Sequence, residues 1–147
     1  MSPSEHYRQF LQDVQKRGCF ASKEEAATAV SGVLMATAEV LSQSQADEIC
    51  RGLPGELLVY LRPAHEEADP YFDSHLFLGW VVSSFDSTGA RDKTAGGLDL
   101  YSHYSGDEAI RRCQGVFSVL KPLLDEQQRE KLRSCLPEEV EAWFREA

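Results

Sequence analysis

Long apolar runs are missing from this sequence, and that absence excludes the simplest membrane architecture. A helix crosses a bilayer with about 20 consecutive apolar residues, and no stretch of the chain approaches that length. The opening residues, Met1–His6, also lack the apolar segment of a secretory signal peptide. We therefore predict no membrane span and a cytoplasmic location.

Basic residues are scarce relative to acidic ones. The chain has 15 Lys and Arg against 24 Asp and Glu, which gives a formal net charge of −9 at pH 7. Proteins that bind nucleic acids neutralise phosphates with clustered Lys and Arg. The composition therefore argues against DNA or RNA as a partner, and for the same reason against an anionic membrane surface.

Cysteine is present, but the cysteines are not spaced as in a metal site or a disulfide framework. The four cysteines are Cys19, Cys50, Cys113 and Cys135, and no two of them form a Cys-x-x-Cys pair. A zinc site or a disulfide framework would show paired spacings. We expect thiols that are mostly buried as small apolar side chains, and the sequence leaves a redox role open.

Motifs for phosphate binding and di-iron chemistry are absent as well. Ala95-Gly96-Gly97 is not followed by the Lys-Ser/Thr of a phosphate-binding loop. No histidine has a glutamate three residues before it, as di-iron helix bundles require. Nothing in the sequence brings Cys19 or Cys113 together with His103 as a nucleophile and its base. We predict no catalytic residues and no cofactor.

One segment does have the chemistry of metal ligands. Two histidines and four carboxylates lie between His65 and His75. Such side chains bind zinc, iron or manganese, but this spacing matches no known site, and an acidic linker explains the same composition. We expect no metal here, with metal binding kept as the open alternative.

What the sequence does contain is a tandem repeat. Residues 22–61 recur as residues 105–144 at an offset of 83, with no gap. Ten of the 40 aligned positions are identical, and Leu53–Glu56 returns as Leu136–Glu139. A repeat of this length indicates that one supersecondary unit has been duplicated.

Each copy carries the signals of helix ends. Four capping boxes, in which a capping residue stands three positions before Glu or Gln, begin at Ser22, Ser42, Ser105 and Asp125. Pro54 and Pro137 mark the starts of later helices, and Gly18 should end the first helix as a left-handed cap. Apolar residues recur between these signals at helical spacing. We predict an all-α fold, a helical bundle built from two homologous four-helix repeats.

The domain organisation follows from the repeat. Residues 1–61 form the first helical repeat, residues 62–74 an acidic linker, and residues 75–147 the second repeat. The second copy is longer by 16 residues, which places an inserted loop at about 86–103. Its first part is rich in Gly, Thr and Asp, the composition of a flexible loop.

The candidates for a recognition surface lie in this insertion. They are Arg91, Lys93, Tyr101, His103 and Tyr104. Aromatic side chains elsewhere in the chain fit the core of a bundle. The aromatic residues beside the flexible loop have no place in that core, so we predict that they contact a partner.

Gly32 and Gly115 hold equivalent positions inside the long helices of the two copies. Glycine in a helix interior costs roughly 1 kcal/mol relative to alanine. We predict that each glycine permits the close approach of a neighbouring segment. The alternative is that both were inherited from one ancestral copy and merely tolerated.

These motifs resemble those of a prokaryotic family known as domain-of-unknown-function family 2267. The residues that carry the resemblance in the first copy are Glu24-Glu25-Ala26, Leu41-Ser42 and Leu53–Leu57. In the second copy they are Asp107-Glu108-Ala109, Leu124-Asp125 and Leu136–Glu139. The resemblance covers nearly the whole chain and implies a small, all-helical, soluble bacterial protein. It supplies no catalytic residues.

Two functions fit these observations. The first is a non-catalytic protein-interaction module, a monomer or homodimer that binds another protein through the groove between its halves or through the insertion. The second is a small-ligand or metal-binding protein with its site between the two repeats, where pockets often form. An enzyme ranks third, because no catalytic constellation is present.

Overall fold

The computed structural model describes residues 5–63, 65–86 and 106–147. In these ranges the chain forms helices and no strand, so the predicted all-α class is confirmed. The helices in chain order are α1 (Glu5–Arg17), α2 (Lys23–Glu39), α3 (Gln43–Ile49), α4 (Gly55–Leu61), α5 (Ser74–Asp86), α7 (Gly106–Leu120), the 3-10 turn η2 (Lys121–Leu123), α8 (Glu126–Cys135) and α9 (Glu138–Glu146).

The two helices α3 and α8 begin with the capping boxes that the sequence predicts. The Ser42 hydroxyl accepts from the Gln45 amide at 3.2 Å, and Gln45 Oε1 accepts from the Ser42 amide at 2.8 Å. The Asp125 carboxylate and Gln128 repeat the exchange at 2.7 and 2.9 Å. Each box satisfies two amides that a helix start leaves without partners. The box expected at Ser105 lies outside the described residues.

Prolines set three further boundaries. Pro54 and Pro137 are the N-caps of α4 and α9. Pro122 lies in η2, directly after the end of α7. A proline cannot donate to the preceding turn, so the bend predicted in this helix appears as a tighter 3-10 turn.

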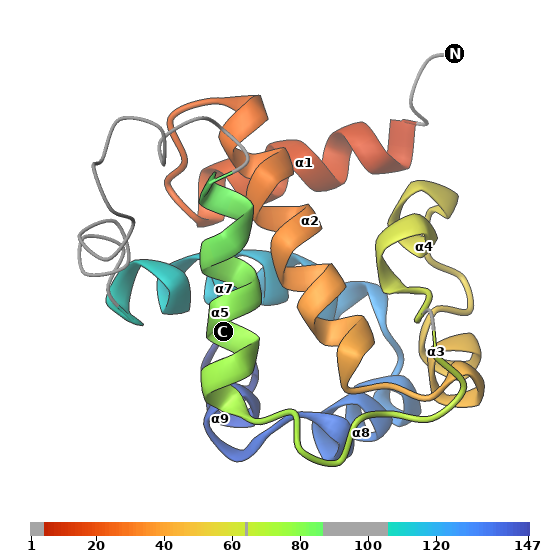
Figure 1. Cartoon of the computed structure of the whole chain (residues 1–147). Helices are drawn as coiled ribbons and strands as arrows, with labels where there is room; N and C mark the ends of the chain where they lie inside the picture. The colour runs from red at the N-terminus through yellow and green to blue at the C-terminus, as the bar shows by residue number, and fades with distance from the viewer. Residues whose placement is uncertain (1–4, 64, 87–105) are drawn as a thin grey trace.

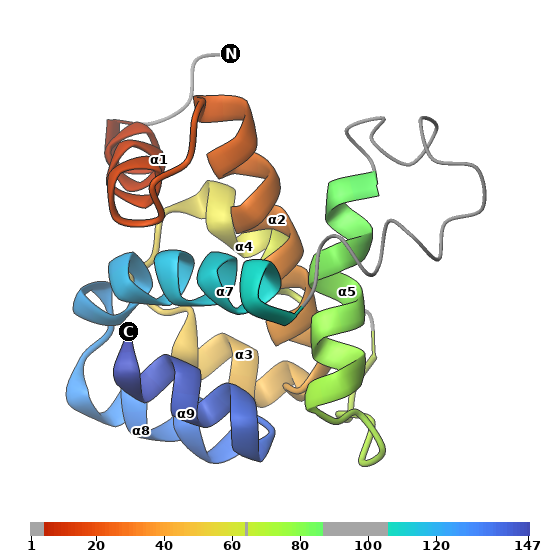
Figure 2. The same cartoon turned by 90° about the vertical axis from the view of Figure 1, so that its left-hand side faces the viewer.

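The long helices α2 and α7 form the centre of the bundle and contact each other. Figure 2 shows α7 running across α2 and α5. Helix α4 packs on α2, α9 packs on α7, and α3 lies beside α8. These three contacts follow the order of the repeat, but the superposition of the two halves as homologous repeats stays a prediction.

The first helix of each half packs across the predicted domain boundary. Helix α1 contacts both α2 and α7, and α5 packs mainly against α2 while also touching α7 (Figure 1). Buried residues from all these helices belong to one core cluster. The predicted division at residues 62–74 therefore separates sequence copies whose side chains share a single core.

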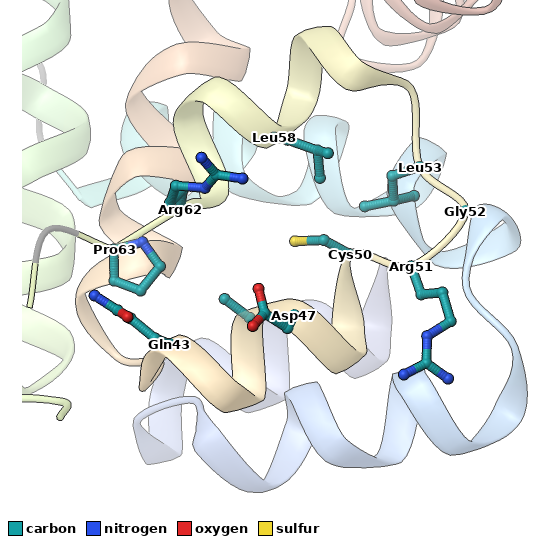
Figure 3. Close-up of a pocket in the computed structure, with 10 residues that line it drawn as sticks. Gln43, Asp47, Cys50, Arg51, Gly52, Leu53, Leu58, Arg62 and Pro63 are labelled. Carbon is teal, nitrogen blue, oxygen red and sulfur yellow. The ribbon is translucent and has the colours of Figure 1, made fainter. Parts of the chain in front are cut away.

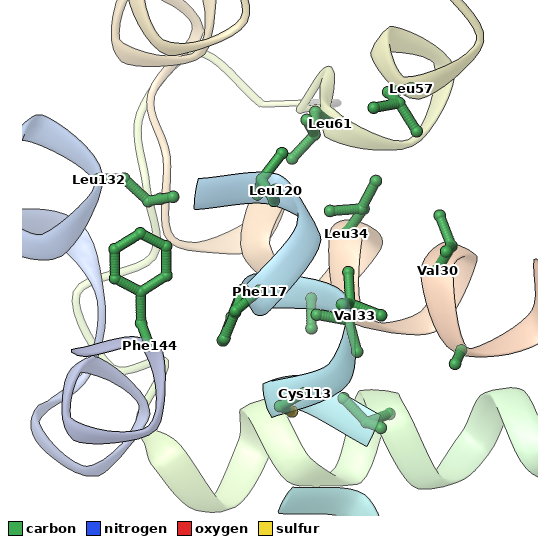
Figure 4. Packing of buried hydrophobic residues seen from close by; sticks show 14 of the residues in the cluster. Val30, Val33, Leu34, Leu57, Leu61, Cys113, Phe117, Leu120, Leu132 and Phe144 are labelled. Atoms are coloured by element: carbon green, nitrogen blue, oxygen red, sulfur yellow. The ribbon is translucent and has the colours of Figure 1, made fainter. Parts of the chain in front are cut away.

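The core is filled where α2, α4, α7 and the last two helices meet (Figure 4). The Phe117 ring of α7 stacks edge-on against Phe144 of α9, with 5.2 Å between ring centroids and 76° between their planes. Phe77 of α5 also approaches Phe117, with 6.5 Å between the ring centroids. All three rings belong to the second half, and burying each of them removes a large apolar area from water.

The turn after α1 differs from the prediction. Gly18 does not adopt the left-handed conformation, and Cys19 does, with φ of 55°. Gly18 is needed for space instead, because a Cβ there would collide with the Phe20 ring. A Cβ at Gly115 would likewise lie 2.9 Å from the Gly18 Cα. The close approach predicted for Gly115 is therefore present, and Gly32 is buried in α2.

Arginines of α7 hold the same turn in place. The Arg112 guanidinium pairs with Glu25 at 3.2 Å, and Arg111 donates to the Gly18 carbonyl. Both guanidinium carbons lie over the Phe20 ring, at 5.3 Å for Arg111 and 5.5 Å for Arg112. Cations over an aromatic face are attracted by its quadrupole, so this cluster fixes the α1–α2 turn against α7.

Candidate functional site: cavities between helices

The predicted recognition residues fall where the structure gives no description. Arg91, Lys93, Tyr101, His103 and Tyr104 all lie in residues 87–105, outside the described ranges. The recognition role of this insertion stays a prediction.

The acidic linker is tied to the end of α2. His65 Nε2 lies 3.0 Å from the Leu41 carbonyl oxygen, and His65 Nδ1 lies 3.4 Å from Glu39 Oε2. The Gln43 amide donates to the Glu66 carbonyl at 3.0 Å. Within residues 5–63, 65–86 and 106–147, no three His, Cys, Asp or Glu side chains lie close enough together to hold a metal ion. The contacts of His65 are those of a residue that fastens the linker.

The four cysteines are free thiols. Cys50 and Cys113 are buried, Cys135 is half-buried and Cys19 is exposed. The pKa of Cys50 is raised to about 11, mainly by burial; nearby Asp47 also raises it, and Arg62 lowers it. Burial also raises the pKa of Cys113 and Cys135. These three thiols are therefore protonated at neutral pH, the form that is a poor nucleophile.

No helix in the described ranges has both the length and the apolar character needed to cross a bilayer.

A cavity of about 510 Å³ opens between the two halves, and we call it the α1–α7 cavity. Its lining comes from one face of α1, from the connector between α3 and α4, and from the end of α7 with η2. The lining residues are His6, Gln9, Phe10, Asp13, Arg17, Gly52, Leu53, Pro54, Ser118, Val119, Pro122 and Leu123.

The local sequence explains why this cavity stays open. Gly52 adopts φ of 89°, a conformation that favours glycine, and it turns the chain from α3 into the connector. Pro122 ends regular α-helix in η2, and the neighbouring Leu123 remains 47% exposed. Phe10 and Val119 form buried parts of the wall. The result is an apolar cavity with an exposed leucine at its rim.

Charged groups of α1 line the same cavity. Asp13 accepts from the Gln9 amide nitrogen at 3.0 Å. Arg17 is exposed and forms no ion pair within the described part of the chain. It is therefore available to an anionic group of a bound molecule.

Two further cavities adjoin this one. The α7–α9 cavity, of about 350 Å³, shares Arg17 and Ser118 with it. The α3–α4 cavity, of about 530 Å³, shares Gly52 and Leu53 with it (Figure 3). The α1–α7 and α7–α9 cavities thus meet at Arg17 and Ser118. We call these two cavities together the interhelical groove.

The sequence suggested a groove between the halves but identified none of its lining residues. Its polar residues on α1, such as Gln9 and Asp13, recur at helical spacing and resemble an ordinary solvated face. The one local signal is Pro122 followed by Leu123, which places an apolar residue in a tight turn. The lining otherwise gathers only when three distant segments meet.

The chain was compared with curated proteins and with models of protein families. No curated protein matches the chain. The model of a family described as "Uncharacterized conserved protein (DUF2267)" matches residues 7–143. The match spans both halves and confirms the resemblance seen in the sequence motifs. The chain therefore belongs to the DUF2267 family.

Proposed function

We propose that this protein is an interaction module that binds a segment of another protein in the interhelical groove. The observation that carries the proposal is the pair of cavities that share Arg17 and Ser118, the α1–α7 cavity and the α7–α9 cavity. Two neighbouring cavities suit an extended segment better than a compact small molecule.

The α1–α7 cavity suggests which side chains the segment contains. Its wall includes Phe10, Leu53 and Val119, which offer apolar surface to one large side chain. Apolar anchors that fill such pockets supply most of the affinity in protein interfaces. Arg17 at the boundary with the α7–α9 cavity favours an acidic residue nearby. The proposed partner segment thus combines a large apolar residue with an acidic one.

A peptide-display selection on the purified protein tests the proposal. We expect enrichment of peptides with a large apolar residue close to Asp or Glu, and their affinities can be measured by fluorescence polarisation. The substitutions Leu123→Glu and Arg17→Glu should each weaken binding by about tenfold or more, because a tenfold change corresponds to about 1.4 kcal/mol.

Matched variants control for changes in surface charge. Val59 is an apolar residue of α4 that is 76% exposed, and Arg8 is an exposed arginine of α1. Neither lines any of the three cavities, so Val59→Glu and Arg8→Glu should leave the affinity unchanged. Selected peptides that bind Leu123→Glu and Arg17→Glu as tightly as the parent would refute the groove as the binding site.

The alternative function is a small ligand held between the halves. The volume of the α1–α7 cavity, about 510 Å³, lies within the range of ligand pockets, about 300–1,000 Å³. Native mass spectrometry separates the two functions. A small molecule that remains bound to the purified parent, and is lost in Leu123→Glu, would favour the alternative.

A further inference from the structure

The α3–α4 cavity has a polar end and an apolar end. Gln43, Asp47 and Arg62 lie toward one side, and Leu53 and Leu58 lie toward the other (Figure 3). The Cys50 sulfur points into the space between them (Figure 3). The cavity is lined by the first half and the start of the linker, whereas the α1–α7 cavity lies between the halves.

Two opposite charges face this cavity without meeting. Asp47 and Arg62 both line it, and neither forms an ion pair within the described residues. Both are close enough to influence the Cys50 thiol, in opposite directions. A carboxylate and a guanidinium at one end of a cavity complement a molecule that carries an ammonium and a carboxylate group.

The helix spacing explains this arrangement. Gln43, Asp47 and Cys50 recur at intervals of four and three residues on α3, so they share one face of that helix. Leu58 and Arg62 are four residues apart at the end of α4 and face the same space. Arg51 also lines the cavity, but its guanidinium points away from it, toward α8 (Figure 3).

We propose that the α3–α4 cavity binds a small apolar α-amino acid as its zwitterion. Asp47 receives the ammonium group, Arg62 receives the carboxylate, and Leu53 and Leu58 contact the apolar side chain. The volume of about 530 Å³ suits a ligand of this size, since ligand pockets measure about 300–1,000 Å³. The neutral Cys50 thiol adds a small, weakly polar wall and takes no part in covalent chemistry.

Isothermal titration calorimetry with L-leucine, L-phenylalanine and L-tryptophan tests the site. We expect at least one of these amino acids to bind. N-acetyl-L-leucine and L-leucinamide each lack one charge of the zwitterion, so each should bind about tenfold or more weakly than leucine if leucine is the ligand, because a charge-assisted contact is lost.

Variants test whether Asp47 binds the ammonium group of the ligand and Arg62 its carboxylate. Asp47→Asn and Arg62→Gln change exposed side chains, so the fold should persist, which circular dichroism verifies. Each should weaken amino-acid binding by about tenfold or more. Arg8→Gln is the matched control and should leave binding unchanged, because Arg8 is exposed and does not line the cavity.

Three results would overturn the proposal. The first is that none of the three amino acids binds. The second is binding that survives both Asp47→Asn and Arg62→Gln. The third is an N-acetylated amino acid that binds as well as the free one, which would show that the cavity takes an apolar anion instead.

Discussion

At the scale of single residues, Gly115 decides how closely α7 can approach the end of α1. A Cβ added there would lie 2.9 Å from the Gly18 Cα. That neighbour is backbone, which cannot rotate away as a flexible side chain would. The space around Gly79 in α5 is different, because a Cβ added there would meet no atom within 4 Å.

These two glycines give opposite predictions for substitution by alanine. Gly115→Ala should destabilise the protein by about 1–3 kcal/mol, because overpacking outweighs the gain in helix propensity. Gly79→Ala should stabilise it by roughly 0.5–1 kcal/mol, because only the propensity changes. Urea unfolding measures both. If Gly115→Ala also stabilises the protein, the close approach does not control the packing.

The thiols should differ in reactivity according to burial. Iodoacetamide at neutral pH should label exposed Cys19 first, and should label Cys50 slowly because its side chain is buried and its pKa is raised to about 11. Cys113 is fully buried and should react only on unfolding. Mass spectrometry of the digested protein gives the order, and Cys113 labelled together with Cys19 would contradict the structure.

At the scale of elements, Tyr7 connects α1 to α4. The pKa of Tyr7 is raised to about 12, mainly by burial, with smaller contributions from the Tyr60 hydroxyl and the Glu56 carboxylate. A hydrogen bond joins the Tyr7 and Tyr60 side chains. Ionisation of Tyr7 is therefore less favourable in the folded protein than in the unfolded chain.

This shift predicts a loss of stability in alkali. A group whose pKa is higher in the folded state contributes stability below its unfolded pKa, and loses that contribution as pH rises through the folded value. For Tyr7 the window runs from pH 10.0 to about 12. Urea unfolding across this window should show a smaller loss for Tyr7→Phe than for the parent. Equal losses in both proteins would mean that Tyr7 is not the responsible group.

At the scale of the whole molecule, the sequence predicted features that depend on neighbouring residues, such as helix caps. It did not predict which distant segments pack together. The capping boxes at Ser42 and Asp125 depend on residues three positions apart, so the sequence shows them directly. The left-handed residue proved to be Cys19 and not Gly18, because Gly18 is required for contact with Phe20. That contact depends on tertiary packing, which no capping rule contains.

The packing of α1 and α5 across the halves was also hidden from the sequence. An apolar stripe shows that a helix is buried on one side, but it does not say which neighbour covers that side. The interhelical groove depends on the same packing, because α1 supplies one wall and α7 with η2 supplies the other. Composition alone directed attention to residues 91–104 instead.

The central claim is that the interhelical groove is the binding surface, and amide chemical shifts test it directly. A selected peptide should be titrated into ¹⁵N-labelled protein. The account predicts that the largest shift changes occur in α1, in the connector around Gly52 and Leu53, and from Ser118 to Leu123. Changes confined to residues 87–105, or to the outer face of α5, would contradict it.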